Sequence, residues 1–375
     1  MAGIYIHIPF CKKACHYCNF HFSTQTQHID AFTQALIKEI ALQKHYLHEP
    51  VETIYFGGGT PSLLPQSSLE AIVTELYKQL TIAENIEFTF EANPDDITSK
   101  KVQDWKKVGV NRLSIGIQSF QNNALAWMNR AHQVAQSFQA IEAAQDAQIY
   151  NISVDLIYGT PHLKDEELIQ DIAIIKKYEI PHVSCYALTV EEKTALHHMI
   201  EKGKIANINT EDQARQFELI VAGLQAQGME HYEISNFAKP GKRSRHNSSY
   251  WKGIPYLGLG PSAHSFNGQS RQWNIANNAL YIQSIEKETL PFELEHLDLY
   301  TKYNEYMMVS LRCMEGIDKK YIEAKFGNSL LEHTIAIASD FIQQGKLLQT
   351  EKGYTIHPNA RFLADGIASD FFWIQ

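Results

Sequence analysis

Short runs rich in β-branched and aromatic residues alternate with amphipathic runs through the first two-thirds of this 375-residue chain. In the amphipathic runs apolar residues recur at intervals of three and four, as at Leu69, Val73 and Leu76, which predicts helices. Strands that are joined through helices run parallel with right-handed crossovers, so the alternation predicts an α/β fold. The predicted strands are 3–8, 53–56, 86–91, 112–118, 152–157 and 183–188, and the predicted helices are 30–46, 66–80, 98–107, 132–147, 165–178 and 211–227.

The even spacing of these units favours a sheet that curls toward a barrel. Only six strand-helix units are present, whereas a closed barrel of this kind has eight. We therefore expect a partial (β/α)6 barrel over residues 1–285. A doubly wound open sheet is the competing topology.

The remaining residues, 286–375, have a different character. Helical patterns at 297–311, 318–326 and 329–343 precede two alternating runs around Gly353, which predict a hairpin within 346–356. This order predicts a small winged-helix-like α+β domain. Such domains often bind DNA, but no basic stripe is present and the net charge is −9, so we expect no nucleic-acid partner.

Three of the five cysteines lie within eight residues, as Cys11, Cys15 and Cys18. An odd cysteine count in a chain of this size argues against a disulfide framework and favours metal or cluster ligands. Zinc would need a fourth ligand, such as His7, His16 or His21. A [4Fe–4S] cluster on three cysteines would leave one iron open to a small molecule, and the residues alone do not choose between these metals.

The predicted strands end in polar or glycine-rich segments. Gly57-Gly58-Gly59-Thr60-Pro61 follows the second strand, and Glu91, Gln118 and Asp155 lie at or near the ends of the next three. In parallel α/β folds the carboxyl ends of strands meet at one edge, where ligands bind. We therefore predict a ligand site there, beside the three cysteines.

The chain has the features of a cytoplasmic protein that does not span a membrane. No apolar stretch approaches about 18 residues. Residues 1–10 lack the cationic start and the small-residue cleavage site of a secretory leader.

Three segments resemble the radical S-adenosylmethionine (SAM) family, and more narrowly its coproporphyrinogen-oxidase-like branch. They are Tyr5–Cys18, which contains Tyr-x-His-Ile-Pro-Phe-Cys and the C-x3-C-x2-C spacing, Gly57–Pro61, and Asp155–Pro161. The resemblance implies a [4Fe–4S] cluster on Cys11, Cys15 and Cys18, with SAM on the open iron. It also implies that SAM contacts residues at the matching positions, namely Tyr5, Tyr17, Gly58, Gly59, Thr60, Glu91, Gln118, Arg130, Asp155 and Ala187.

Two groups within this branch compete, an oxygen-independent coproporphyrinogen III dehydrogenase and a haem chaperone. The dehydrogenase pattern has a further cysteine two positions after the third, where this chain has Phe20 behind Asn19, and a longer segment before the signature. His246-Asn247-Ser248-Ser249-Tyr250-Trp251 matches the H-N-x-x-Y-W motif of the chaperones.

The resemblance thus predicts a chaperone that binds haem and delivers it to acceptor haemoproteins, membrane respiratory enzymes among them. The alternative is oxidative decarboxylation of coproporphyrinogen III to protoporphyrinogen IX, an activity that the three differences disfavour. The sequence leaves open whether SAM is cleaved and whether the chain forms a homodimer.

His246 has two interpretations. Its imidazole could ligate haem iron, with the neighbouring aromatic residues against the porphyrin. It could instead fix a loop through hydrogen bonds while Trp251 packs in the core. His264 is another candidate for a haem contact.

Overall fold

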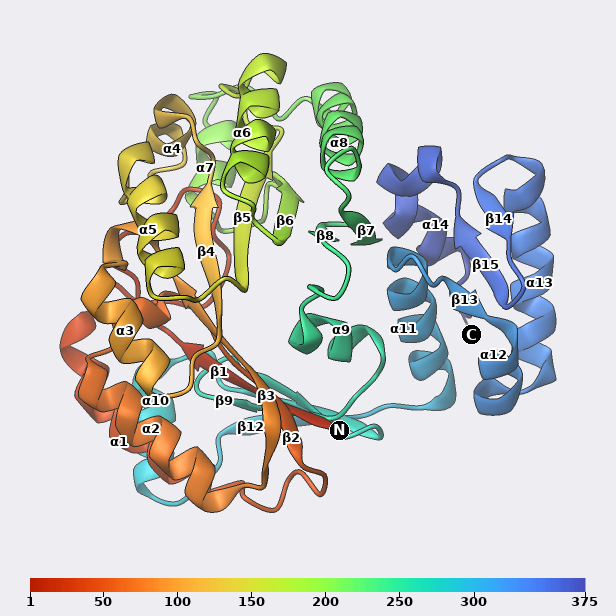
Figure 1. Cartoon of the computed structure of the whole chain (residues 1–375). Helices are drawn as coiled ribbons and strands as arrows, with labels where there is room; N and C mark the ends of the chain where they lie inside the picture. The colour runs from red at the N-terminus through yellow and green to blue at the C-terminus, as the bar shows by residue number, and fades with distance from the viewer. Residues whose placement is uncertain (375) are drawn as a thin grey trace.

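A curved sheet dominates the fold of residues 1–374, which are the residues described by the computed structural model (Figure 1). The sheet has 12 strands, and its central six follow one another in sequence order, all parallel. A doubly wound sheet would reverse this order part-way, so the predicted partial barrel is confirmed. The six strands are β1 (Ala2–Ile8), β2 (Val51–Gly58), β3 (Ile82–Ala92), β4 (Arg112–Gln118), β5 (Ile152–Tyr158) and β6 (His182–Ala187).

Helices cover the outer, convex face of these strands (Figure 1). Alternate residues of β1, Ile4, Ile6 and Ile8, are fully buried on this side, where they join Phe32 and Leu36 in the main hydrophobic core. The covering helices are α1 (Ile29–Leu42), α2 (Gln66–Gln79), α3 (Ser99–Lys107), α5 (Val134–Asp146), α6 (Asp165–Lys177) and α8 (Thr210–Gln225). Each was predicted; α4 (Asn122–Trp127), α7 (Ala195–Glu201) and the 3-10 turns Thr26–His28, Pro61–Leu63, Pro94–Asp96 and Pro358–Leu363 were not.

The opposite, concave face of the same strands is polar. Because strand side chains alternate, the residues between the core positions point inward. The interior of a closed barrel is usually filled by Val, Ile and Leu side chains. The concave face of this sheet instead carries hydroxyl, carboxyl, imidazole and guanidinium groups, which indicates a ligand site rather than a core. These residues are Tyr5, His7, Thr53, Tyr55, Glu87, Thr89, Glu91, Arg112, Ser114, Ser153, Asp155, His182 and Ser184.

Short strands extend both edges of the sheet, and the sequence reasoning missed all of them. They are antiparallel except for β9, which pairs in parallel with β1. Each has three to five residues, which is too few for an alternating pattern to stand out. The missed elements are β7 (Glu230–Glu233), β8 (Asn236–Ala238), α9 (Arg245–Trp251), β9 (Tyr256–Leu259), β10 (His264–Phe266), β11 (Ser270–Asn274), α10 (Asn278–Glu286) and β12 (Phe292–His296).

A second, smaller hydrophobic core lies in the C-terminal part of the chain, built around Tyr303, Met307, Ile322, Phe341 and Phe371. The three predicted helices and the hairpin are present there. The boundary expected between residues 285 and 286 falls before β12, which still belongs to the large sheet. The elements are α11 (Leu299–Arg312), β13 (Ile317–Asp318), α12 (Lys319–Phe326), α13 (Asn328–Gln343), β14 (Leu347–Gln349), β15 (Gly353–Ile356) and α14 (Ala364–Asp370).

Ion pairs connect the two cores. Arg312 on α11 donates from Nε to Glu233 Oε1 at 3.0 Å. Arg271 on β11 donates two hydrogen bonds, of 2.7 and 3.0 Å, to the Glu305 carboxylate on α11. Within residues 1–374, no helix is both long and apolar enough to cross a membrane.

Candidate functional site

The loop that carries Cys11, Cys15 and Cys18 follows β1, and all three thiols are free and half-buried. Backbone hydrogen bonds hold the loop at its start, where the Cys11 amide donates to the carbonyl of Ser23 at 3.0 Å. The middle is held by His16, whose amide donates to the Met128 carbonyl at 3.2 Å. The loop is therefore fixed against the segment after β4. Its sulfurs stay partly exposed and do not belong to the hydrophobic core.

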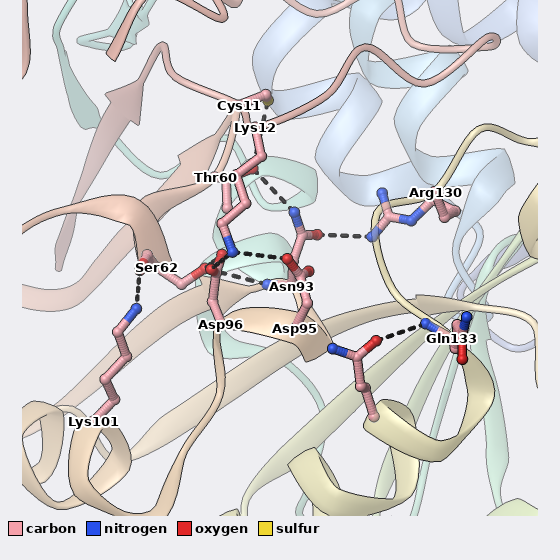
Figure 2. Close-up of polar contacts among 11 residues, drawn as sticks. Cys11, Lys12, Thr60, Ser62, Asn93, Asp95, Asp96, Lys101, Arg130 and Gln133 are labelled. Atoms are coloured by element: carbon pink, nitrogen blue, oxygen red, sulfur yellow. Dashed lines mark hydrogen bonds and ion pairs between the residues drawn. The ribbon is translucent and has the colours of Figure 1, made fainter. Parts of the chain in front are cut away.

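Two side chains approach the sulfurs, Thr60 from the segment after β2 and Arg130 from the segment after α4. Thr60 Oγ1 donates to Cys11 Sγ at 3.4 Å, and Arg130 Nη1 donates to Cys15 Sγ at 3.4 Å. Asn93 links these two donors, because its Nδ2 donates to Thr60 Oγ1 at 3.2 Å and its Oδ1 accepts from Arg130 Nη2 at 2.7 Å (Figure 2). Burial raises the pKa of the Cys11 thiol to about 11, which the Thr60 hydrogen bond opposes.

A charged network anchors the same loop from below. Lys12 pairs with Asp95 at 2.8 Å and with Asp96, whose carboxylate also accepts from Ser62 Oγ at 2.9 Å (Figure 2). Lys101 donates to the Ser62 carbonyl at 2.9 Å. Because Asp96 is buried, its ion pair and hydrogen bond tie the cysteine loop to the segments after β2 and β3.

The glycine segment lies directly against the start of the cysteine loop. The Gly59 amide donates to the Ile8 carbonyl at 2.9 Å. A Cβ atom on Gly59 would lie 2.7 Å from the carbonyl oxygens of both Ile8 and Phe10, so only glycine allows this approach. Gly58 has a φ of 100°, a left-handed conformation that also favours glycine. The predicted segment is therefore next to the cysteines.

Two carboxylates, Glu91 and Asp155, face the concave side from β3 and β5. Tyr55 donates to Glu91 Oε1 at 2.6 Å, and Ser114 Oγ lies 3.4 Å from each Asp155 oxygen. Burial, together with repulsion from Asp155, raises the pKa of Glu91 to about 8. Burial likewise raises the pKa of Asp155 to about 6. Burying two carboxylates near each other is costly, so the site favours a cation.

The other predicted SAM-site residues surround the same face. Gln118 ends β4 with a φ of 67°, and a Cβ on Gly116 would lie 3.0 Å from its Nε2 and 3.3 Å from Arg130 Nη2. Ala187 ends β6 in register with Tyr158. Tyr17 lies beside Cys15 and Arg130, and burial raises its pKa.

Tyr5 and His246 lie deeper in the concave face. The Tyr5 ring stacks on Tyr55 at 6.1 Å, and its hydroxyl is 3.2 Å from His7 Nδ1. His246, on α9, stacks on Tyr55 at 5.0 Å. Tyr55 lies between His246 and Glu91, so His246 is not at the rim where the other predicted residues meet.

Both ring nitrogens of His246 are in hydrogen bonds, Nδ1 with Thr53 Oγ1 and Nε2 with Tyr250 OH, each at 2.8 Å. The residue is 2% exposed. A Cβ on Gly3 would lie 2.9 Å from Thr53 Oγ1, so glycine at this position of β1 leaves room for the pair.

Sequence reasoning did not single out Asn93, Tyr55, Lys12 or Asp96. Asn93 lies two residues beyond Glu91, just past the end of β3. That position after a strand end could have marked Asn93 as a site residue. The inward position of Tyr55 could have been read from the alternation within β2. Nothing in the sequence indicates that Lys12 and Asp96 form an ion pair.

Comparison with known proteins bears on this geometry. The Radical SAM superfamily model matches residues 5–175, and the HemN C-terminal domain model matches residues 297–363. "Heme chaperone HemW" of Bacillus subtilis is 32% identical over 375 residues, covering 99% of each chain. The chain belongs to the HemW family. "Heme chaperone HemW" of Lactococcus lactis is 33% identical and covers 97% of each chain.

The fold of this HemW-family chain is also that of a solved enzyme structure. Coproporphyrinogen III oxidase (HemN) from Escherichia coli superposes with a TM-score of 0.86, covering 99% of this chain and 89% of that one, at 21% identity. At this identity the likeness concerns the fold.

Membership of the radical SAM superfamily implies a [4Fe–4S] cluster and SAM. The thiol arrangement fits such a cluster. One tetrahedral zinc ion would hold its sulfurs about 3.8 Å apart. Among the residues the structure describes, the group of three candidate ligand atoms within 4.8 Å of one another is His197, His198 and Glu201, and the three cysteines form no such group. At least one pair of the three sulfurs is therefore more than 4.8 Å apart, which suits a cluster that offers each sulfur its own iron.

Proposed function

We propose that this HemW-family protein is a haem chaperone, which binds haem and passes it to acceptor haemoproteins while carrying a [4Fe–4S] cluster and SAM. The observation that carries the proposal is the full-length similarity to proteins named heme chaperones. Phe20, where the dehydrogenase pattern has a cysteine, and the His246–Trp251 motif support the same function.

In this proposal Cys11, Cys15 and Cys18 ligate three irons, and the fourth iron holds SAM. When bound, the cluster and SAM supply one-electron chemistry. Backbone groups of Gly58 and Gly59 face the amino-acid end of SAM, and the carboxylates accept from its ammonium or ribose hydroxyls. Tyr5, Tyr17, Thr60, Gln118, Arg130 and Ala187 complete the site, as the family resemblance implies.

A large cavity between the barrel and the C-terminal core supports a bulky cargo. Its volume is about 1740 Å³, above the roughly 300–1,000 Å³ typical of small-ligand pockets. Aromatic and cationic side chains line it, among them Tyr250, Tyr256, Phe266, Arg271 and Lys302. Aromatic surfaces suit a porphyrin face, and cations suit its propionates.

One cluster-loaded preparation tests the proposal. We expect stoichiometric haem binding in a titration and transfer of that haem to an apo-haemoprotein on mixing. Incubating the same sample anaerobically with coproporphyrinogen III, SAM and a reductant should yield no protoporphyrinogen IX. Formation of that product without haem transfer would support the dehydrogenase instead.

SAM affinity should increase with pH between about 7 and 9, one pH unit on either side of the raised pKa of Glu91. Below this window Glu91, whose pKa burial raises to about 8, is protonated and cannot attract the sulfonium or ammonium charge. Above it the carboxylate is ionised and attraction is complete. Equilibrium dialysis across this range should show the dissociation constant falling several-fold as pH rises.

The matched variant for this prediction is Glu91→Gln, which keeps the side-chain shape and cannot ionise. We expect its SAM affinity to stay near the low-pH value of the wild type. A variant that retained the full pH dependence would assign that dependence to another group, such as Asp155.

A further inference from the structure

The cavity between the two cores extends from the cysteine loop to α11. Phe20, two residues after Cys18, is 64% exposed and lines one part of it. Tyr5 and His7 of β1 line the side of the cavity formed by the sheet, and Lys302 of α11 lines the side formed by the C-terminal part of the chain. Figure 1 shows α9 between the sheet and α11, where the cavity lies. A ligand large enough to fill this space would touch both cores and the loop of the proposed cluster.

Three histidines are candidates for an iron ligand in or beside this cavity. Both nitrogens of His246 are engaged, as described above. His7 is also engaged, because Nε2 bonds the His21 carbonyl at 2.8 Å and Nδ1 lies 3.2 Å from the Tyr5 hydroxyl. An iron ligand needs a free nitrogen lone pair, so either residue would first have to lose a hydrogen bond.

His264 differs from both. It begins β10, is exposed to the cavity, and has no side-chain hydrogen bond in the described part of the chain. Its ring stacks on Trp273, at 5.9 Å and 29°, which orients it without occupying either nitrogen. Because strand residues two apart share a face, His264 and Phe266 present an imidazole and an aromatic ring on the same wall.

We propose that His264 is the protein ligand of haem iron in this cavity, and that His246 supports the wall through Thr53 and Tyr250 without touching iron. The inference rests on the proposed chaperone function. A neutral imidazole is a common haem ligand, and the neighbouring aromatic rings offer apolar surface to the macrocycle.

The charges around His264 indicate where the propionates bind. Arg271 lies 6.0 Å from the Phe266 ring and is neutralised by Glu305. Lys302 precedes Glu305 by three residues on α11, so it lies on the same side of the helix, and it has no ion pair among residues 1–374. Lys302 is therefore a cation available to a propionate on this side of the cavity, while Lys252 and Lys325 line other parts of it.

The test is a haem titration of the cluster-loaded full-length protein, followed by absorption spectroscopy. His264→Ala should lose the spectrum of the histidine-ligated form and weaken binding on the order of tenfold or more, and free imidazole should restore the spectrum. His296→Ala removes an exposed strand histidine outside the cavity and should behave as the wild type. Lys302→Gln should keep the ligand spectrum with weaker, less salt-sensitive binding.

The outcomes separate the two proposals. A wild type that binds no haem defeats the chaperone function itself. A wild type that binds haem, with His264→Ala unchanged in spectrum and affinity, overturns only the ligand assignment, and loss of the spectrum in His246→Gln would transfer that role to His246. Should His264→Ala not fold, the absorption spectrum of haem-loaded His264→Tyr tests the ligand assignment. A phenolate-ligated spectrum supports the assignment, and a wild-type spectrum contradicts it.

Discussion

Replacing Cys15 by serine is expected to abolish the iron–sulfur cluster. A serine hydroxyl is a harder and far less acidic ligand than a thiol, and two remaining cysteines do not hold a cubane that already lacks a fourth protein ligand. After anaerobic reconstitution, iron and acid-labile sulfide should fall from about four of each per chain to near zero. SAM binding should fall with them, because its iron is gone.

Cys313→Ser is the matched control. Cys313 is a free, half-buried thiol like Cys15, but it lies at the end of α11, where it forms an isolated β-bridge with Glu233. We expect this variant to assemble the cluster normally. Full iron and sulfide content in Cys15→Ser, or a wild type that purifies with one zinc ion and no sulfide, would contradict the cluster assignment.

The barrel could be predicted from the sequence because its strands and helices each carry a strong local signal. The six central strands appear within a few residues of their expected positions, although β3 begins four residues earlier, at Ile82. The edge strands lack such a signal. β9 spans only Tyr256–Leu259, and its parallel pairing with β1 depends on tertiary contacts over some 250 positions of chain.

The site was predictable to the extent that it follows the topology. The carboxyl ends of parallel strands meet at one edge of the sheet. The sequence therefore predicted that the glycine segment, Glu91 and Asp155 lie beside the cysteines. The partners of these groups could not be predicted in the same way. Whether Asn93 bridges Thr60 and Arg130, or whether His246 has a free nitrogen, depends on side-chain geometry that no spacing encodes.

The alternation along the strands explains how one sheet serves both stability and binding. In β5, Val154 and Leu156 face the helices while Asp155 between them faces the concave side. A shift in register by one residue would exchange these faces and bury a carboxylate in the core. The apolar face therefore fixes which strand side chains of the site face the concave side.

Replacing Gly59 by alanine should displace the backbone that supports the cysteine loop. The added Cβ would lie 2.7 Å from the Ile8 and Phe10 carbonyl oxygens, and backbone atoms, unlike a flexible side chain, cannot turn away. Either the Gly59 amide loses its 2.9 Å bond to Ile8, or the segment leading to Cys11 moves. Overpacking of this kind costs about 1–3 kcal/mol in the free energy of unfolding.

We expect Gly59→Ala to fold, to melt at a lower temperature than the wild type, and to bind SAM on the order of tenfold more weakly, since a displacement near 1 Å is enough to spoil a preorganised site. Gly366→Ala is the control, because a Cβ there meets no atom within 4 Å and glycine in helix α14 carries an entropic cost. That variant should equal or exceed the wild type in stability and match it in SAM affinity. Thermal denaturation and equilibrium dialysis on both variants measure the two effects separately. If Gly59→Ala matched the wild type in both measurements, the glycine segment would not be the rigid support of the cysteine loop that the 2.9 Å contact indicates.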